Sequence, residues 1–478
     1  MEARNLIGGQ WTDTTNRTEV KNPADWNQTV GTIPLSETQD IDKAVQAAWS
    51  ARRTWKALGA VARGNILFQA ANMLESHLDE LGLLAAQEMG KPIGEARGEA
   101  ARAVAILRYY GGEGSRSLGE VVPAANPSTL QYTTREPLGV VGIITPWNFP
   151  LAIPMWKAAP ALVYGNTVVI KPAELSSLTA YRMWEIIASL FPAGVVNLVI
   201  GQGFKAGEAV IQHPLVDGIS FTGSTGVGQH IAETAVAHGV KYQLEMGGKN
   251  PVIVADDADF ELAVELIVSG AMRSAGQKCT ATSRVIIMEK IRQEFTERLV
   301  SQVQTLSQGD PSQSNTYLGP VVSQAQYDKV MGLIDQGRAE GGRVLTGGTP
   351  IGGPLAHGYF IPPTVFDEVA TTATIAQEEI FGPVIAMIPV KSIDEAIDVA
   401  NGVRYGLSAS VFTRNLKTAM AFVEGIEAGL VRVNEETAGV ELQAPFGGVK
   451  ASSSHSREQG RAAIEFYTHT KTVAIRPF

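Results

Sequence analysis

The chain has 478 residues, of which 45% are hydrophobic and 18% are charged, and it contains 49 glycines and 24 prolines. This composition excludes a disordered or fibrous protein, and the length predicts two or more domains. A single cysteine excludes an internal disulfide, and no apolar run of about eighteen residues or more predicts a membrane span. The net charge of −9, with both signs interspersed, argues against nucleic-acid binding.

The N-terminal sequence MEARNLIGGQWTDTTNRTEV lacks a basic region followed by an apolar stretch. We therefore expect no signal peptide, no membrane association and a reducing, cytoplasmic location.

Apolar residues at helical spacing predict two amphipathic helices near the N-terminus. The first spans 38–58 and places these residues on one face: Ile41, Ala44, Val45, Ala48 and Trp55. The second is marked by Ile66, Ala70, Met73, Leu74 and Leu81.

From residue 140 onward the pattern changes to short apolar runs separated by helical ones. Runs of the first series predict buried parallel strands at 140–146, 167–172, 195–201 and 217–223. A second series follows at 251–255, 283–289, 383–390, 408–413 and 429–434. A capping-box pattern, Ser392-Ile393-Asp394-Glu395, starts a helix between two of these strands.

The predicted fold class is α/β, with two successive open parallel sheets that join near residues 245–250. The stretch 119–139 and the tail 467–478 fit neither series, and we expect strands outside the main sheets there.

A glycine-rich segment, FTGSTGVG at 221–228, lies between the strand 217–223 and an expected helix. An open α/β sheet binds nucleotides at such a place, because glycines admit the phosphate and the helix N-terminus favours its charge. Thr225 stands where G-x-G-x-x-G has its second glycine, so a structural turn explains the motif equally well. Lys171 and Glu174 add a pair able to hydrogen-bond ribose hydroxyls, although a surface lysine and a helix-start glutamate give the same pattern.

The only cysteine, Cys279, lies in the stretch MRSAGQKCTATSR at 272–284. Free cysteines are often buried for packing alone, but this one follows small or polar neighbours on a loop that enters a strand. A nucleophilic thiol also needs a base and donors for a developing oxyanion. Glu245, beside a Gly-Gly turn, and Asn148, at the end of a strand, are the candidates.

Several motifs in order then identify a family. They are TPWNFP (145–150), KPAE (171–174), FTGSTGVG (221–228), LEMGGKNP (244–251), GQKC (276–279), EEIFGPV (378–384) and APFGGVK (444–450). Together they resemble the NAD(P)-dependent aldehyde dehydrogenase superfamily over essentially the whole chain.

This resemblance implies that Cys279 attacks the aldehyde carbonyl to form a thiohemiacetal. The side-chain amide of Asn148 and the backbone N–H of Cys279 would hold the oxyanion, and Glu245 would activate the water that hydrolyses the thioester. This glutamate favours a hydrolytic enzyme over relatives that transfer the acyl group to coenzyme A. Lys157 matches a family lysine assigned to the proton path, and a helix-surface lysine is the simpler alternative.

For the cofactor, the resemblance implies a G-x-T-x-x-G signature formed by Gly223, Thr225 and Gly228. Further cofactor positions are expected at Trp147, Lys171, Glu174, Gly203, Gly207, Phe221, Ser224, Glu379 and Phe381. Glu174 would accept hydrogen bonds from the ribose hydroxyls and repel a 2′-phosphate, so NAD is preferred and NADP is a weaker alternative. No metal is expected.

The resemblance places Phe149, Trp156, Arg273 and Phe446 around the substrate aldehyde. Arg273 would pair bidentately with a distal carboxylate, and a surface or interdomain salt bridge is the alternative. The run VRVNEETAGVELQAPFGGVKASSSHSREQGRAA at 431–463 resembles that of 2-oxoglutarate semialdehyde dehydrogenases. The hypothesis is therefore oxidation of a carboxylate-bearing semialdehyde, 2-oxoglutarate semialdehyde first, with succinate semialdehyde or a broad aldehyde range as alternatives.

The same resemblance divides the chain into domains. An NAD-binding domain is expected at 1–118 and 140–245, with 435–458 packing back on it, and a catalytic domain at 246–434. Residues 119–139 and 459–478 would form an oligomerisation element, and their exposed strand edges imply a homodimer or homotetramer.

Overall fold

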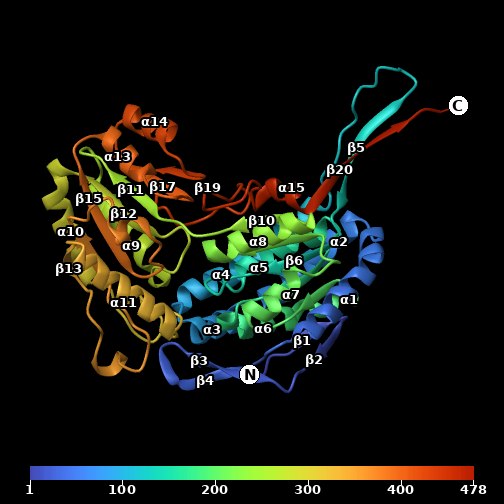
Figure 1. Cartoon of the computed structure of the whole chain (residues 1–478), viewed down its shortest axis with the longest axis horizontal. Helices are drawn as coiled ribbons and strands as arrows, with labels where there is room; N and C mark the ends of the chain where they lie inside the picture. The colour runs from blue at the N-terminus through green and yellow to red at the C-terminus, as the bar shows by residue number, and fades with distance from the viewer. Residues whose placement is uncertain (478) are drawn as a thin grey trace.

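A computed structural model describes residues 1–477 (Figure 1). Two lobes, each built on a β-sheet with helices against it, lie side by side, and a two-stranded ribbon projects from the molecule near the C-terminus. The α/β class with two successive, mainly parallel sheets is confirmed.

The first lobe is organised around a seven-stranded sheet of order β10-β9-β6-β7-β8-β1-β2. Its parallel strands are β6 (Val140–Ile144), β7 (Thr167–Lys171), β8 (Val196–Leu198), β9 (Gly218–Thr222) and β10 (Lys241–Glu245). The antiparallel edge is formed by β1 (Asn5–Ile7) and β2 (Gln10–Thr12). Strand order reverses between β6 and β9, and ligands bind at the carboxyl ends of strands beside such a reversal.

The helices of this lobe are α1 (Thr38–Ala57), α2 (Ala60–Glu75), α3 (Leu78–Met89), α4 (Ile93–Glu113), α5 (Ala152–Val163), α6 (Ser177–Ile187), α7 (Glu208–Ile211) and α8 (Thr225–His238). The helix predicted at 38–58 corresponds to α1, and all of its predicted apolar residues are buried. The second predicted helix was wrong as a single element. The first part ends at Glu75 as α2, and Leu81 belongs to α3, which begins after the Ser76-His77 turn. Met73, expected on the apolar face, is exposed on α2.

The second lobe has a seven-stranded sheet of order β13-β14-β15-β12-β11-β17-β18. Its strands are β11 (Asn250–Val254), β12 (Thr282–Met288), β13 (Arg343–Thr346), β14 (Thr364–Asp367), β15 (Val384–Val390), β17 (Ser408–Phe412) and β18 (Leu430–Val433). Its helices are α9 (Phe260–Met272), α10 (Arg292–Gln304), α11 (Gln324–Ala339), α12 (Thr374–Gln377), α13 (Ile393–Asn401) and α14 (Leu416–Gly425).

At the start of α13 the Ser392 hydroxyl accepts from the Glu395 N–H, whereas the Glu395 carboxylate accepts from the N–H of Lys391.

The chain passes from the first sheet to the second between Glu245 and Asn250. A later segment returns to this crossing: the N–H of Met246 donates to the Ser452 carbonyl at 2.7 Å, and that of Ser454 donates to the Leu244 carbonyl at 2.9 Å. The C-terminal segment therefore packs along the strand that ends at Glu245.

The strands expected outside the two sheets, within 119–139 and 467–478, are present, and two further strand pairs that were not predicted accompany them. The ribbon in Figure 1 pairs β5 (Leu130–Pro137) antiparallel with β20 (Thr468–Ile475), which follows the short helix α15 (Ala463–Tyr467). Smaller pairs are formed by β3 (Arg17–Asn22) with β4 (Asp25–Pro34), and by β16 (Tyr405–Gly406) with β19 (Val449–Lys450).

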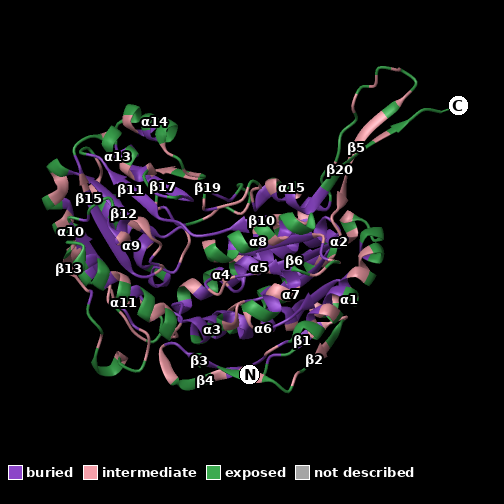
Figure 2. Ribbon diagram, in the orientation of Figure 1, coloured by how far each residue is buried: buried purple, intermediate pink, exposed green. Residues whose placement is uncertain are grey.

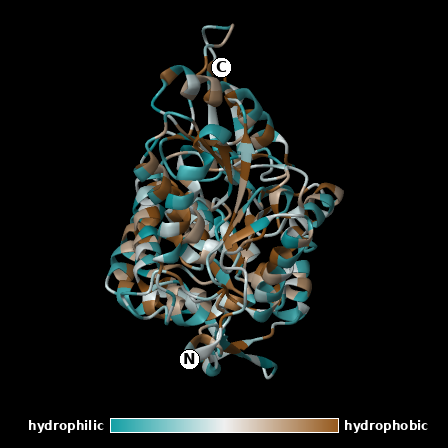
Figure 3. Ribbon diagram, turned by 90° about the vertical axis from the view of Figure 1, so that its left-hand side faces the viewer, coloured by the Kyte–Doolittle hydropathy of each residue, from teal (hydrophilic) through white to brown (hydrophobic). Residues whose placement is uncertain are grey.

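Burial is concentrated on the central strands and on the helix faces that cover them (Figure 2). The strands are also rich in hydrophobic residues, which predicts their place in the core (Figure 3). Among the described residues, no helix has the length and apolarity that a membrane span requires.

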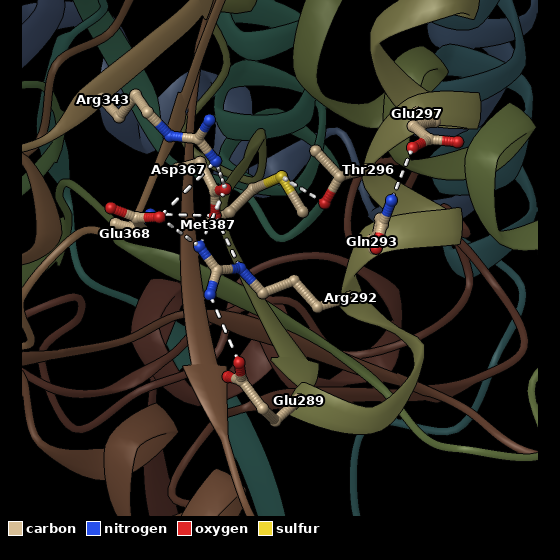
Figure 4. Close-up of polar contacts among 9 residues, drawn as sticks. All are labelled: Glu289, Arg292, Gln293, Thr296, Glu297, Arg343, Asp367, Glu368 and Met387. Carbon is tan, nitrogen blue, oxygen red and sulfur yellow. Dashed lines mark hydrogen bonds and ion pairs between the residues drawn. The ribbon is translucent and has the colours of Figure 1, made fainter.

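One edge of the second sheet is held by ion pairs (Figure 4). Asp367, at the end of β14, is 2% exposed in its side chain and pairs with Arg292 of α10 at 2.9 Å and with Arg343 of β13 at 2.8 Å. Arg292 also pairs with Glu368 at 3.0 Å. These groups satisfy one another, so the cluster ties helix and strands together.

Candidate active site

A cavity of about 160 Å³ lies at the carboxyl ends of β6 and β9, where the first sheet reverses its strand order. It is lined by Pro146, Trp147, Asn148, Ile153, Thr222, Gly223, Ser224, Met246, Gly247, Cys279, Gln326, Lys329, Glu379 and Phe381. The cysteine, the amide and the glycine-rich loop that the sequence singled out therefore share one cavity, built from both lobes.

Asn148 enters this cavity on the loop that follows β6, and it is 4% exposed. Its Nδ2 donates to the Gln277 carbonyl at 2.8 Å, while its Oδ1 has no hydrogen-bond partner among the described residues. An amide nitrogen carries two hydrogens, so one donor remains beyond the bond to Gln277. Asn148 is thus tethered to the loop of Cys279 and still able to donate to a substrate oxygen.

Cys279 follows α9 and a tight turn at 273–276. Ser274, Ala275 and Gly276 all have left-handed backbones, with φ of 56°, 53° and 69°. A Cβ on Gly276 would lie 2.1 Å from the Gly382 carbonyl oxygen, so only glycine fits this close approach. The turn brings the thiol into the cavity, a position that hydrophobic periodicity does not reveal.

The electrostatics of the resting site favour a neutral thiol. Burial raises the pKa of Cys279 to about 12, and the carboxylates of Glu379 and Glu245 add to that rise. A thiolate therefore has to be generated by a base during reaction rather than stored in the free protein.

Glu245 ends β10 and is 2% exposed. Its Oε2 accepts from the Ser453 hydroxyl at 2.5 Å, and its Oε1 has no partner among the described residues. Burial, followed by the nearby Glu458 carboxylate, holds the pKa of Glu245 well above its usual range. The carboxyl is not among the groups that line the cavity, although its charge acts on Cys279.

Lys157, on α5, is fully buried, unlike the helix-surface lysine considered as an alternative. Its ammonium pairs with Glu458 and donates to the Ser220 hydroxyl at 3.0 Å. Sequence reasoning missed Glu458, because it stands in the polar run HSREQG that resembles a solvent-exposed loop. No periodicity or motif marks it, and only its contact with Lys157 reveals it.

At the carboxyl end of β7, Lys171, Glu174 and Gly203 come together. The Lys171 ammonium donates to Glu174 Oε2 at 3.2 Å, and the Gly203 N–H donates to Glu174 Oε1 at 2.7 Å. Burial lowers the pKa of Lys171. Gly207, also expected near the cofactor, has open space around the position of a Cβ.

The glycine-rich loop leads into α8, and Ser224 is the N-cap residue without a capping hydrogen bond from its side chain. The first N–H groups of this helix are therefore available to an anion. A Cβ on Gly223 would lie 2.4 Å from the Phe221 ring, and one on Gly228 would lie 2.4 Å from Met246 Sδ. Phe221 itself is buried below the loop, and Thr225 Oγ1 lies 3.3 Å from the hydroxyl of Tyr405.

The opposite wall carries Glu379 and Phe381. Glu379 Oε1 accepts from the Gly248 N–H at 3.0 Å, and burial raises the pKa of its carboxyl. The Phe381 ring meets the Trp147 ring edge-on, with centroids 5.4 Å apart. Gln326 and Lys329 of α11 also line this wall, and sequence reasoning missed both because their helix is far from every motif.

The residues expected around the substrate are more scattered. Trp156 and Phe446 are both buried, with ring centroids 5.4 Å apart, and neither lines the cavity that holds Cys279. Phe149 lies under the ammonium of Lys91, 3.8 Å from its ring centre. Arg273 is exposed and lies 5.8 Å from the ring centre of Tyr317. The salt bridge considered for Arg273 does not occur among residues 1–477.

The sequence model that describes the aldehyde dehydrogenase family matches residues 11–473 of this chain. The chain belongs to the aldehyde dehydrogenase family.

Similar proteins with known names support this assignment. The alpha-ketoglutaric semialdehyde dehydrogenase of Bacillus subtilis (strain 168) is 50% identical over 99% of this chain and 98% of its own length. The alpha-ketoglutarate semialdehyde dehydrogenase of Haloferax volcanii is 41% identical over 98% of each chain. Among solved structures, betaine aldehyde dehydrogenase of Staphylococcus aureus in complex with NAD+ has a TM-score of 0.96 at 34% identity, over 99% of this chain and 95% of that one.

Within this aldehyde dehydrogenase, the recognition made from motifs is confirmed, and so is the predicted fold. Five of the motifs contribute residues to the same cavity, namely TPWNFP, FTGSTGVG, LEMGGKNP, GQKC and EEIFGPV. The roles of the single residues stay predictions.

Proposed function

We propose that this aldehyde dehydrogenase oxidises a carboxylate-bearing semialdehyde, 2-oxoglutarate semialdehyde before succinate semialdehyde, with NAD preferred over NADP. The observation that carries the substrate proposal is Arg273, an exposed guanidinium shortly before Cys279 that forms no ion pair among residues 1–477. The names of the relatives from Bacillus subtilis and Haloferax volcanii support the same class of substrate.

The residues present fit a dinucleotide. Lys171 and Glu174 would hold the adenosine ribose beside Gly203, the uncapped N-terminus of α8 with Ser224 would hold the pyrophosphate, and Glu379 would hold the second ribose. When bound, NAD would take up a hydride from the carbon of the thiohemiacetal on Cys279, which leaves a thioester. The carboxylate of Glu174 repels a 2′-phosphate, which supports a preference for NAD.

In the first half of the reaction, the Cys279 sulfur attacks the aldehyde carbon. Because burial holds the thiol neutral, a base has to take up its proton. The carboxylates of Glu379 and Glu245 both act on Cys279, and since Glu379 is the proposed ribose contact, Glu245 is the proposed base. The oxygen of the thiohemiacetal gains negative charge, and the remaining hydrogen of Asn148 Nδ2 and the backbone N–H of Cys279 donate to it. Loss of one such donor slows comparable enzymes by about 10²–10³ in kcat.

In the second half, Glu245 activates a water that hydrolyses the thioester on Cys279. Its partnerless Oε1 is the atom that would accept the proton of this water. The proton then moves toward the carboxylate of Glu458, whose charge acts on Glu245 and which pairs with the buried Lys157. A coenzyme A-acylating enzyme would have no need of this base, so a Glu245→Ala variant with full steady-state oxidation would support that alternative.

The substrate proposal is tested by comparing kcat/KM for 2-oxoglutarate semialdehyde, succinate semialdehyde and a neutral aldehyde of equal length, each with NAD and with NADP. We expect the neutral aldehyde to be at least tenfold poorer, since a charge-assisted bidentate pair contributes about 1.5–3 kcal/mol. In Arg273→Met the higher kcat/KM of the two carboxylate-bearing aldehydes should disappear. Arg97→Met removes an exposed guanidinium from α4 and serves as the matched control. Equal values for all three aldehydes in the wild type would refute the carboxylate pocket.

We further propose that the ribbon of β5 and β20, with residues 119–139 and 459–478, joins copies of the chain into a homodimer or homotetramer. The ribbon projects away from both lobes, as Figure 1 shows, and among the described residues the outer edge of β20 pairs with no other strand. Such an edge favours pairing with another chain. A cytoplasmic, reducing setting belongs to this proposal, because the only cysteine has to remain a free thiol.

A further inference from the structure

The start of α4 contacts both loops that carry the proposed catalytic groups. Lys91 lies two residues before the first residue of the helix, and Glu95 and Glu99 lie one turn apart on the same face of it. None of these residues belongs to a motif that identifies the family, and none lines the cavity.

Lys91 and Glu99 hold the loop of Asn148. Their side chains form an ion pair and are only 1% and 2% exposed. The Lys91 ammonium donates to the Asn148 carbonyl oxygen at 2.8 Å. Glu99 Oε1 accepts from the N–H groups of Leu151 at 2.7 Å and Ala152 at 3.1 Å, where α5 begins. The loop is thus fixed at the backbone of Asn148 and again where α5 begins.

Glu95 holds the other loop, the one that leads to Cys279. Its Oε1 accepts from the Ser274 N–H at 3.1 Å, and its Oε2 accepts from the Ser274 hydroxyl at 2.6 Å. Ser274 is the first residue of the left-handed turn, a conformation that L-residues other than glycine rarely adopt. Two hydrogen bonds from a neighbouring helix are the kind of contact that keeps such a turn in place.

The two loops also bind each other, so the contacts form a closed circuit. Asn148 Nδ2 donates to the Gln277 carbonyl, and Gln277 Nε2 donates to the Ser274 carbonyl at 3.1 Å. From α4 the circuit runs through Glu95 to the cysteine loop, across to Asn148 and back through Lys91. Displacing one loop therefore strains the contact that fixes the other.

We propose that Lys91, Glu95 and Glu99 act as a positioning brace that sets the separation between the Asn148 amide and Cys279. The inference rests on the proposed function in one respect, since it takes these two residues as oxyanion donor and nucleophile. Misplacement of reacting groups by about 1 Å costs up to 10²-fold in rate, and a long helix is a stiffer reference than either loop.

The test is a set of double-mutant cycles on kcat, with Asn148→Ala as the second background. The variants are Glu95→Ala and the double variant Lys91→Met with Glu99→Gln, which removes both buried charges together and keeps an oxygen for Leu151 and Ala152. Each is expected to lower kcat about tenfold while KM for NAD stays within about twofold. In the Asn148→Ala background the same changes should alter kcat by less than about twofold, because the amide they position is gone.

Glu88→Gln is the matched control. Glu88 is a buried glutamate that caps α6 through the N–H groups of Leu178 and Thr179, both at 2.7 Å, so it resembles Glu99 without contacting either loop. Its kcat should stay within about twofold of wild type even where its melting temperature falls. Glu95→Gln, which keeps one oxygen for Ser274, should recover most of the kcat lost in Glu95→Ala.

Equal losses of kcat in both backgrounds, or wild-type kcat in Glu95→Ala, would overturn the brace. Because Glu95 is half-exposed, its variants decide the question even where the buried double variant fails to fold. Wild-type kcat in Asn148→Ala alone would instead overturn the oxyanion assignment, and the brace with it. The two failures are therefore distinguishable.

Discussion

Lys157 and Glu458 form an ion pair in which both side chains are buried, with exposures of 0% and 2%. Glu458 also contributes, after burial itself, to the raised pKa of Glu245, whereas Lys157 lowers it. The ion pair therefore tunes the proposed base, and its two members act in opposite directions.

The first prediction concerns the acid side of the pH profile. Glu458→Gln removes a negative charge near Glu245, so the pKa of Glu245 should fall and the acid limb of kcat/KM should move to lower pH by about one unit. Lys157→Met should move the same limb to higher pH. The measurement is kcat/KM against pH for the three proteins. A limb that stays in place in both variants would show that it does not report Glu245.

A second prediction follows for stability. Because the pKa of Glu245 is raised in the folded protein, its stabilising contribution is complete below the ordinary glutamate value, about 4.3, and is lost as pH rises through the raised pKa. Glu245→Gln stays neutral and still accepts from the Ser453 hydroxyl. Its melting temperature relative to wild type should therefore increase between about pH 5 and pH 8. A difference that is constant over this range would contradict the raised pKa.

The third prediction isolates the thiol. Cys279→Ala should abolish aldehyde oxidation and leave NAD affinity within about twofold, because the side chain is a nucleophile rather than part of the proposed ribose or pyrophosphate contacts. Titration calorimetry gives the affinity, and the absorbance of reduced cofactor gives the rate. Cys279 is the only cysteine, so alkylation of the wild type reports this residue alone. Measurable turnover in Cys279→Ala would remove the cysteine from the mechanism.

The sequence predicted the parts of the site that sit at strand ends or in glycine turns. Short apolar strands and small residues leave a local signal, which made Asn148, Gly223 and Cys279 candidates, and the resemblance to the family then gave each of them an expected role. The supports were not predictable: Glu458, Lys91 and Glu99 are polar residues in stretches that resemble solvated surface. Their partners lie far away in the chain, and one sequence carries no sign of such contacts.

The same reason explains the errors in the fold. The periodicity of α2 continued through the turn at His77, so Leu81 was placed in the wrong helix. The strands β13 and β14 were missed because their sequences, RVLT and TVFD, mix polar with apolar residues and form no apolar run, and β13 pairs antiparallel at the edge. Their place is set by the sheet and by the Arg343–Asp367 ion pair rather than by a local pattern.

The fourth prediction concerns cofactor choice. Glu174→Gln keeps oxygen and size but removes the charge that opposes a 2′-phosphate, and it leaves the buried Lys171 ammonium without its partner carboxylate. The ratio of kcat/KM for NAD to that for NADP should fall by about tenfold or more. Glu185→Gln, which changes the same charge on α6 beside Arg182, should leave the ratio unchanged. An unaltered ratio in Glu174→Gln would mean that another residue sets the preference.

The fifth prediction tests the turn that delivers the thiol. In Gly276→Ala the new Cβ would lie 2.1 Å from the Gly382 carbonyl oxygen, and the backbone at φ 69° disfavours any L-residue. Gly382 follows Phe381, so relief of this clash has to move either the loop of Cys279 or the loop of Glu379 and Phe381. We expect kcat to fall by at least about tenfold and the free energy of unfolding to fall by about 1–3 kcal/mol.

Gly332→Ala is the control for this change, since Gly332 lies in α11 with nothing within 4 Å of the new Cβ. There the substitution should raise the free energy of unfolding by up to about 1 kcal/mol, because alanine favours the helix, and leave kcat unchanged. Urea unfolding and steady-state kinetics on both variants give the comparison. If Gly276→Ala kept wild-type kcat and stability, as is expected of Gly332→Ala, the prediction would be wrong. The close approach between Gly276 and Gly382 would then not be what positions Cys279.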